Sequence, residues 1–427
     1  MARTIPLRVV GRYWALYLFA APAVLMVATF AYFPASSAIY HAFFRWNGSY
    51  IEEFVGLYNF HQLFGWEPGL WLLLGLWMWL TAAALTGRRA PWPGGADASL
   101  AVLAAAVGLL WFTGIGSPLQ AVALEEAGPW LGTVAVTVVL SVALRRTVAE
   151  SWAQGLGGAG LLLAFLWLFY STMRVSGDQT LWSGFGVTFI LVVANLVKMV
   201  PSIVTAVVIH RLRSESWGYA YKVLFVVPMI VPAMVGLLVW KSFYDPAQGI
   251  LNRLLFGTGL IDALVWMDGL FGWEVFRAGA NPSWLGDAAL VIPSLIFWGF
   301  PWVGTVGVLI YLTGLAGIDE SVYEAADMDG VSWLQKFVYI EFPLLMTQVR
   351  INLILMIIGT LQAYGHILVL LGDTGGPKGV ALVPGLYMFR TAFTELYAGK
   401  ACAIGLVIFV FILILTEINN RYVRVEK

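Results

Sequence analysis

Long apolar runs separated by short polar stretches dominate the pattern of this chain. A helix needs roughly 20 apolar residues to cross the hydrocarbon core of a bilayer. We therefore predict an all-α, polytopic transmembrane bundle of about ten spans. The predicted spans cover residues 13–35, 69–86, 99–116, 128–144, 157–173, 184–209, 219–242, 286–313, 347–371 and 400–419.

Composition supports a membrane protein. Of the 427 residues, 60% are hydrophobic and 11% are charged, whereas a soluble domain has about 25% charged residues. The formal net charge of zero does not suggest a nucleic-acid partner. The single cysteine, Cys402, excludes an intramolecular disulfide, and its apolar surroundings favour packing as a small hydrophobe. The apolar stretch that begins at Tyr13 is long enough to predict a first span rather than a cleaved signal peptide.

The distribution of basic residues predicts the orientation of the spans. Cytoplasmic loops of membrane proteins carry an excess of Lys and Arg. With both termini in the cytoplasm, most of the 24 Lys and Arg residues fall in predicted cytoplasmic segments. This agreement favours an even number of spans before residue 184. It also places the polar stretches Gly48–Pro68 and Asp245–Asp287 outside.

One segment between two apolar runs is strongly polar. Residues Tyr323–Pro343 read YEAADMDGVSWLQKFVYIEFP, and a segment this charged must lie outside the bilayer, here on the cytoplasmic side. Asp319 is a good N-cap for a first helix, and Gly330 fits the left-handed position that ends it. Ser332 and Gln335 form the capping-box pattern of a second helix. Pro343 is expected to end that second helix.

The two predicted helices have distinct faces. Glu320, Glu324 and Asp327 form an acidic stripe on the first, which offers charge-assisted contacts to Arg or Lys of a partner. Another face carries Ala325 and Ala326, whose small side chains would allow a close approach. An apolar face on the second helix, made by Trp333, Phe337 and Ile340, is expected to rest on the membrane surface or the bundle. The residues alone leave open an amphipathic connector without a partner.

The polar segment resembles the EAA loop of permease subunits of ABC importers. The match rests on Glu324-Ala325-Ala326, Asp329-Gly330, Ile340 and Pro343. Phe342 stands where leucine is usual, and Asp319 where proline is common. The resemblance implies a coupling segment that docks in a cleft of an ATPase subunit. The residues that it implies for coupling are Glu320, Glu324, Ala325, Ala326, Asp327, Asp329, Gly330 and Pro343.

Further stretches resemble the sugar-type branch of these permeases, which includes the maltose and glycerol-3-phosphate permeases. They are Phe54–Phe60, Tyr244–Pro246, Gly249–Asn252, Trp284–Asp287 and Thr374–Pro377. The resemblance covers residues 1–64 and 184–427. It implies one half of a carbohydrate pathway in a prokaryotic inner membrane. It also implies a heterodimer with a second permease, two ATPase subunits and an extracytoplasmic substrate-binding protein. ATP and Mg would bind to the partners, and no cofactor to this chain.

We divide the chain into three parts. Residues 1–68 hold the N-terminal span and an outside loop, and residues 174–427 hold the permease core with a coupling loop at 316–346. Residues 69–173 are a four-span insertion without a counterpart in the family. The insertion contains almost no ionisable groups within its spans. We interpret the insertion as a lipid-facing attachment or, alternatively, as a docking surface for another membrane protein.

Polar residues inside predicted spans are candidates for the substrate pathway. Lys198 is expected near the bilayer midplane, either paired within the bundle or lining a cavity. Gln362 and His366 share one face of a straight helix and, with Tyr364, could supply hydrogen bonds and an aromatic face to a sugar. Trp298 could shape the cavity wall or simply pack. For Gln362, Tyr364 and His366, the alternative is hydrogen bonding between helices.

The sequence carries no signature of an enzyme. No G-x-x-x-x-G-K-[ST] pattern of an ATP-binding loop occurs, and the four histidines are too scattered to predict a metal site. The chain is expected to rely on separate ATPase subunits. The alternatives are a secondary transporter, which usually shows intramembrane carboxylates or inverted repeats, and a membrane scaffold that transports nothing.

Overall fold

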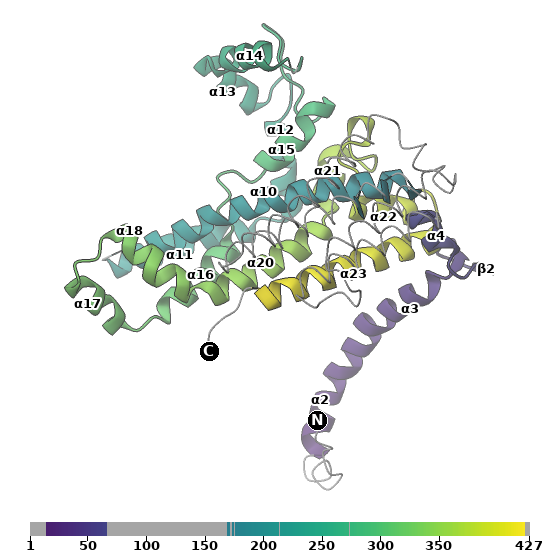
Figure 1. Cartoon of the computed structure of the whole chain (residues 1–427), viewed down its shortest axis with the longest axis horizontal. Coiled ribbons are helices and arrows are strands. Elements are labelled where there is room, and N and C mark those ends of the chain that lie inside the picture. Colours follow the sequence, from purple (N-terminus) through teal and green to yellow (C-terminus); the bar gives the residue numbers. More distant parts are fainter. Residues whose placement is uncertain are drawn as a thin grey trace, which may run out of the picture. The chain divides into compact units, whose positions relative to one another are not determined.

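The computed structural model describes residues 14–65, 169–170, 173–174, 176–212, 214–272 and 274–422. The chain divides into two compact units, whose helices and strands are labelled in Figure 1. The first consists of Met1–Phe60 and Met388–Leu415, and the second of His61–Tyr387 and Thr416–Lys427. Nearly all of the predicted insertion at 69–173 lies outside the described residues. Helices form almost all of the regular structure described, which confirms the predicted all-α class.

The first unit begins with a long apolar helix. Three consecutive elements build it, α2 (Trp14–Val27), the π-helical turn η1 (Ala28–Tyr32) and α3 (Phe33–His41). A hairpin of β1 (Phe44–Trp46) and β2 (Ile51–Phe54), which the sequence did not predict, follows it. The buried Asn59 fixes this turn, because its side-chain amide donates to the carbonyls of Ala42 (2.8 Å) and Phe44 (3.1 Å).

Three further helices contribute to both units or join them along the chain. They are α4 (Tyr58–Phe64), α22 (Pro384–Phe393) and α23 (Ala398–Tyr422). Within the first unit, Gly399 lies so close to the backbone of Phe44 that no larger residue fits without a shift.

Helix α10 (Gln179–His210) runs through the second unit as a single 32-residue helix. The side chain of Asp178 caps its first turn by accepting from the backbone N–H groups of Thr180 and Leu181. The helix is long enough to cross a bilayer. It therefore extends the predicted span at 184–209 at both ends.

Three further predicted spans in the described part of the second unit are broken rather than continuous. The span at 219–242 is divided into α11 (Glu215–Val226), the 3-10 turn η2 (Val227–Ile230) and α12 (Ala233–Phe243), with a bend of 88°. Pro228 and Pro232 explain the break, because proline lacks the N–H that a helix interior requires. The span at 286–313 consists of α15 (Ala288–Phe297) and α16 (Thr305–Ala316).

The span at 347–371 is also broken. Helix α20 (Met346–Leu361) ends three residues before α21 (Gly365–Leu371). No proline lies in this break. The remaining helices of the unit are α13 (Ile250–Thr258), α14 (Leu260–Phe271), α17 (Glu320–Met328), α18 (Trp333–Lys336), η3 (Phe337–Glu341), α19 (Phe342–Leu344) and η4 (Pro377–Gly379).

In the described part of the chain, three helices are long and apolar enough to cross a membrane. The number rises to at most seven if each strongly bent helix pair counts as one span. One such pair joins α16 to α17, but the carboxylates of α17 would be costly in hydrocarbon. The exact number of ten spans stays a prediction.

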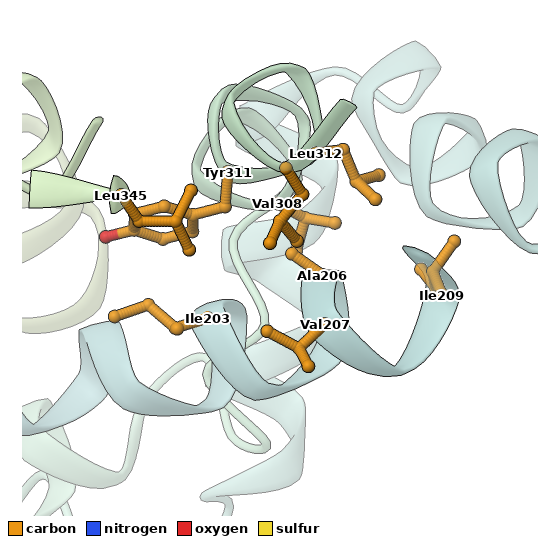
Figure 2. Packing of buried hydrophobic residues seen from close by; sticks show 9 residues of the cluster. Ile203, Ala206, Val207, Ile209, Val308, Tyr311, Leu312 and Leu345 are labelled. Atoms are coloured by element: carbon orange, nitrogen blue, oxygen red, sulfur yellow. The ribbon is translucent and has the colours of Figure 1, made fainter. Parts of the chain in front are cut away.

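A hydrophobic core joins α10 to α16 (Figure 2). Ile203, Ala206, Val207 and Ile209 of α10 pack against four residues of α16 and against Leu345. The α16 residues are Val308, Tyr311, Leu312 and Leu315. Phe337, from the polar segment identified in the sequence, packs against this cluster. The core therefore holds the C-terminal end of α10 against the segment expected to meet a partner.

Candidate functional site

The polar segment folds as the two helices that the sequence predicts. Asp319 caps α17 by accepting from the backbone N–H of Ser321 at 2.9 Å. Hydrogen bonds with the side chain and then the backbone N–H of Ser321 lower the pKa of the Asp319 carboxyl. Gly330 has φ +69° at the end of α17, where a left-handed conformation is required. Ser332 and Gln335 form the predicted capping box at the start of α18. We call residues 319–345 the coupling segment, after the role that the family resemblance implies.

The predicted faces of α17 are partly correct. Glu320, Glu324 and Ala325 are exposed. Asp327 is exposed too, but its carboxylate pairs with Nζ of Lys336 at 2.6 Å, so it is partnered within the chain. Ala326 is buried, contrary to the expectation that both alanines face a partner. The surface that remains open to a partner is therefore narrower than the sequence predicted, with Glu320 and Glu324 as its acids.

Pro343 lies at the end of the second helix, as predicted. The helical stretch continues from α18 through η3 into α19 and ends one residue after Pro343. A bend of 68° then leads into α20.

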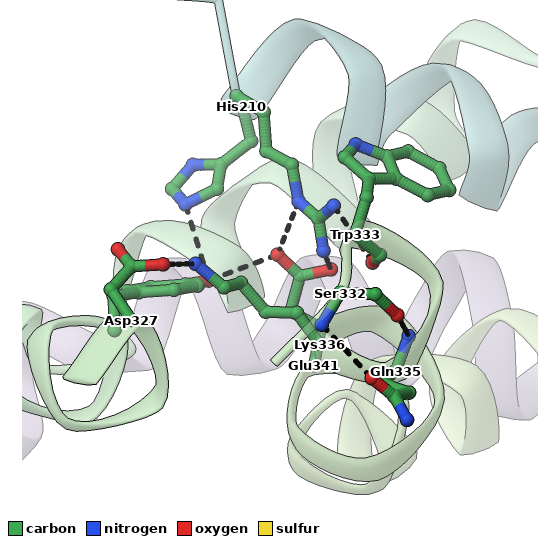
Figure 3. Close-up of polar contacts among 9 residues, drawn as sticks. His210, Asp327, Ser332, Trp333, Gln335, Lys336 and Glu341 are labelled. Carbon is green, nitrogen blue, oxygen red and sulfur yellow. Dashed lines mark hydrogen bonds and ion pairs between the residues drawn. The ribbon is translucent and has the colours of Figure 1, made fainter. Parts of the chain in front are cut away.

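The structure also reveals a buried ion pair that sequence reasoning missed (Figure 3). Arg211, which follows α10, donates from Nε and Nη2 to the two carboxylate oxygens of Glu341, at 2.9 and 2.6 Å. Glu341 is fully buried. The guanidinium also lies 4.5 Å from the ring centre of Trp333 and donates to its carbonyl. A lone carboxylate near an apolar helical face was the only sequence signal for this pair.

Tyr323 of α17 completes this network. Its hydroxyl donates to Glu341 at 3.3 Å and lies 3.4 Å from Nε2 of His210. Burial and the adjacent carboxylate of Glu341 raise the pKa of Tyr323 to about 12. Tyr323 of α17, Trp333 of α18 and Glu341 of η3 therefore all contact His210 or Arg211, at the C-terminal end of α10.

The other candidate site lies at two breaks between helices. The first break, residues 298–304, separates α15 from α16, and the second, residues 362–364, separates α20 from α21. Polar side chains of α10 hold the first break. Nζ of Lys198 lies 3.4 Å from the carbonyl of Leu295 and 3.5 Å from that of Trp298. One turn further along, Oγ of Ser202 accepts from the N–H of Gly304 at 2.9 Å. These contacts supply partners to backbone groups that the helix ends leave open.

The second break is attached to the same stripe of α10. The side-chain amide of Asn195 donates to Oγ1 of Thr360 at 2.9 Å, just before this break. The two breaks also meet directly, because the rings of Trp298 and His366 stack with centroids 4.7 Å apart and an angle of 6° between the planes. Asn195 and Lys198 therefore bring both irregular segments to one side of α10.

The predicted pathway residues are only partly brought together. Lys198, Trp298 and His366 lie in one cluster. Gln362 and Tyr364 are exposed in the second break. Because the helix is interrupted between Leu361 and Gly365, Gln362 and His366 do not share a helical face, contrary to the prediction.

Three of the sequence stretches quoted for the family resemblance meet at Asn252. The buried Asn252 donates to the carbonyls of Pro246 and Pro282, and its side-chain oxygen accepts from the indole N–H of Trp284 at 2.7 Å. Asp287 caps α15 by accepting from the N–H of Ala289. This region fixes where α15, and thus the first break, begins.

Known proteins with similar sequences are ABC transporter permeases. The chain is 28% identical over 288 residues to the "Probable ABC transporter permease protein YesP" of Bacillus subtilis, which covers 63% of this chain and 86% of that protein. It is 26% identical over 308 residues to the lactose transport system permease protein LacF of Rhizobium radiobacter, covering 71% and 96%. It is 27% identical over 270 residues to the maltose/maltodextrin permease MalF of Photorhabdus laumondii, covering 60% and 48%.

Other comparisons are less extensive. No family model matches the chain. A solved bacterial alginate ABC transporter in complex with its periplasmic protein has a chain that aligns with a TM-score of 0.46 and 17% identity, covering 57% of this chain and 77% of that one. Through its sequence similarity to the curated permeases, the chain is identified as a relative of the ABC transporter permease proteins.

Proposed function

We propose that this chain is one of two permease subunits of an ATP-driven importer, and that its solute is a carbohydrate. The single observation that carries the proposal is the coupling segment, whose EAA pattern coincides with two capped helices that expose Glu320 and Glu324. The sugar transport systems named for LacF and MalF support the choice of solute class. The second permease, the two ATPases and a binding protein follow from this class of transporter.

In the proposed mechanism, the ATPase subunits move the coupling segment, and the connected helices change the side from which the pathway is open. A ligand or partner shifts such an equilibrium only by binding its two states with different affinity. The coupling segment must therefore contact the ATPase differently when ATP is bound. We place the ATPase at the exposed face that contains Glu320, Glu324 and Ala325, in the cytoplasm of a prokaryotic cell.

The proposed solute pathway passes the two breaks. Irregular backbone at membrane depth is tolerated only where protein covers it or where it lines a water-filled cavity. The exposed Gln362 and Tyr364 would offer a hydrogen-bonding amide and an aromatic face, both of which suit a sugar. Lys198 and Trp298 would shape the adjacent wall. In the described spans α10, α15, α16, α20 and α21 no acidic residue occurs, which disfavours ion-coupled secondary transport.

Co-purification tests the proposal. The chain, expressed with its neighbouring genes, should copurify with a second permease and an ATPase. The complex in proteoliposomes should take up labelled oligosaccharide only in the presence of ATP and the binding protein. Uptake without ATP, or purification without an ATPase, would contradict the proposal.

A further inference from the structure

Helix α10 is linked to the coupling segment only through side chains. Helix α16 precedes α17 and helix α20 follows α19 along the chain, so both are joined to the segment covalently. The end of α10 instead continues toward α11. Arg211 and Glu341 are 130 residues apart in sequence. Any movement of the coupling segment must therefore reach α10 through noncovalent contacts.

The contacts at this end of α10 are of two kinds. The apolar core of Figure 2 resists separation through contacts that have no directional hydrogen bond. The Arg211–Glu341 pair adds directional contacts, because a guanidinium and a carboxylate in a two-bonded arrangement fix both distance and orientation. The ring of Trp333 packs against the guanidinium of Arg211, and the hydroxyl of Tyr323 donates to the carboxylate of Glu341. Both contacts further restrict the geometry of the pair.

The same helix holds the two breaks further along its length. Asn195 contacts Thr360, two residues before the second break, while Lys198 and Ser202 contact Trp298 and Gly304 of the first break. Lys198 and Arg211 are 13 positions apart, or about 20 Å along the helix at 1.5 Å per residue. A displacement of the cytoplasmic end of α10 is therefore delivered to both breaks, because the intervening helix is continuous.

We propose that α10 transmits the movement of the coupling segment to the two breaks. In this proposal, the buried Arg211–Glu341 pair provides the rigid contact between the coupling segment and α10 that this transmission requires. The inference rests on the proposed function. Arg211 and Glu341 are positioning residues, since Glu341 is fully buried and contacts α10 rather than an ATPase. Losing the pair should leave ATPase docking intact while separating ATP hydrolysis from the rearrangement at the breaks.

The decisive variant replaces both members of the pair by methionine, Arg211→Met with Glu341→Met. Replacing a buried ion pair as a unit by apolar residues is often neutral for stability, whereas removing one partner leaves a buried charge uncompensated. A matched control, Arg45→Met with Glu53→Met, removes an exposed ion pair of the first unit.

The readout is the reactivity of one cysteine at the second break, introduced as Tyr364→Cys in a Cys402→Ala background. Its labelling rate by a maleimide is compared with and without MgATP plus vanadate, in the whole complex. In the parent protein, which keeps Arg211 and Glu341, we expect MgATP plus vanadate to change the labelling rate about tenfold, within the usual range of coupling free energies. In the Arg211→Met, Glu341→Met variant this change should vanish, while ATP hydrolysis and subunit composition stay the same. The Arg45→Met, Glu53→Met control should show the same change as the parent.

A nucleotide-dependent change that persists in the Met/Met variant would overturn the inference and leave the proposed function intact. If that variant does not assemble, Arg211→Lys decides, because it keeps the charge but loses the two-bonded geometry. That variant should show a reduced change, and an undiminished one would equally overturn the inference. If MgATP plus vanadate did not change the labelling rate in the parent protein, that result would instead contradict alternating access at residue 364. It would thus count against the proposed function itself.

Discussion

The imidazole of His366 stacks on the indole of Trp298, with ring centroids 4.7 Å apart and planes 6° from parallel. The two residues flank different helix breaks, and each was a pathway candidate from the sequence alone. Their contact makes the breaks at 298–304 and 362–364 one structural feature. Because side chains of α10 bind both, the predictions below address this feature and its connection to the coupling segment.

Alanine at Gln362 or Tyr364 should impair solute uptake. Both side chains are exposed in a break where they could meet a sugar, and truncation removes an amide or an aromatic face. We expect a raised KM for ATP-dependent uptake in proteoliposomes. Tyr219→Ala, at an exposed tyrosine of α11, is the control and should leave KM unchanged. If neither variant alters affinity or rate, these residues do not contact the solute.

Lys198→Met should weaken the first break. The carbonyls of Leu295 and Trp298 would lose their donor, and an unpaired buried group costs about 1–3 kcal/mol. We expect a lower Tm for the purified complex, measured by thermal unfolding in detergent. Lys222→Met, at an exposed position of α11, serves as the control. An unchanged Tm for Lys198→Met would show that the carbonyls do not depend on this lysine.

Glu324→Lys should abolish coupling to the ATPase without unfolding the chain. The side chain is exposed, and surface substitutions usually change stability by no more than about 0.5 kcal/mol. Reversing the charge at the proposed ATPase contact should lower both copurification of the ATPase and uptake. Asp262→Lys makes the same reversal at an exposed residue of α14 and should be harmless. Normal transport by Glu324→Lys would weigh heavily against the proposed docking face.

Gly314→Ala should destabilise the contact between α16 and α20. A Cβ atom at residue 314 would lie 2.5–2.7 Å from the side chains of Gln348 and Leu345, and overpacking typically costs about 1–3 kcal/mol. Gly359→Ala, in α20, meets nothing within 4 Å and should leave Tm unchanged. Equal Tm values for the two variants would mean that Gln348 moves aside without cost.

The helix boundaries of the coupling segment could be predicted from the sequence. The caps at Asp319 and Ser332 and the left-handed Gly330 depend on residues within about one helical turn, so the sequence could predict them. Pro343 predicted the end of the second helix to within one residue, because proline cannot continue a helix interior. The direction of the bend after Leu344 depends on tertiary packing, and here Leu345 packs in the α10–α16 core.

The breaks show where prediction from the sequence ends. Pro228 and Pro232 could have signalled the division of the predicted span at 219–242 into α11 and α12, but no proline lies in the break at 362–364. Its position depends on contacts such as that between Asn195 and Thr360, which are 165 residues apart. The same holds for Asn252 and Trp284, whose stretches were recognised separately and whose hydrogen bond was not.

The sequence by itself determined that this is a helical membrane protein with a capped, acidic coupling segment. Those conclusions follow from hydrophobic run length, charge distribution and short-range capping. Only the tertiary structure decided that Arg211 pairs with Glu341, that Asp327 pairs with Lys336, and that α10 holds both breaks. The reason is physical: a buried charge or an open backbone group needs a partner, and packing across distant segments selects which partner it meets.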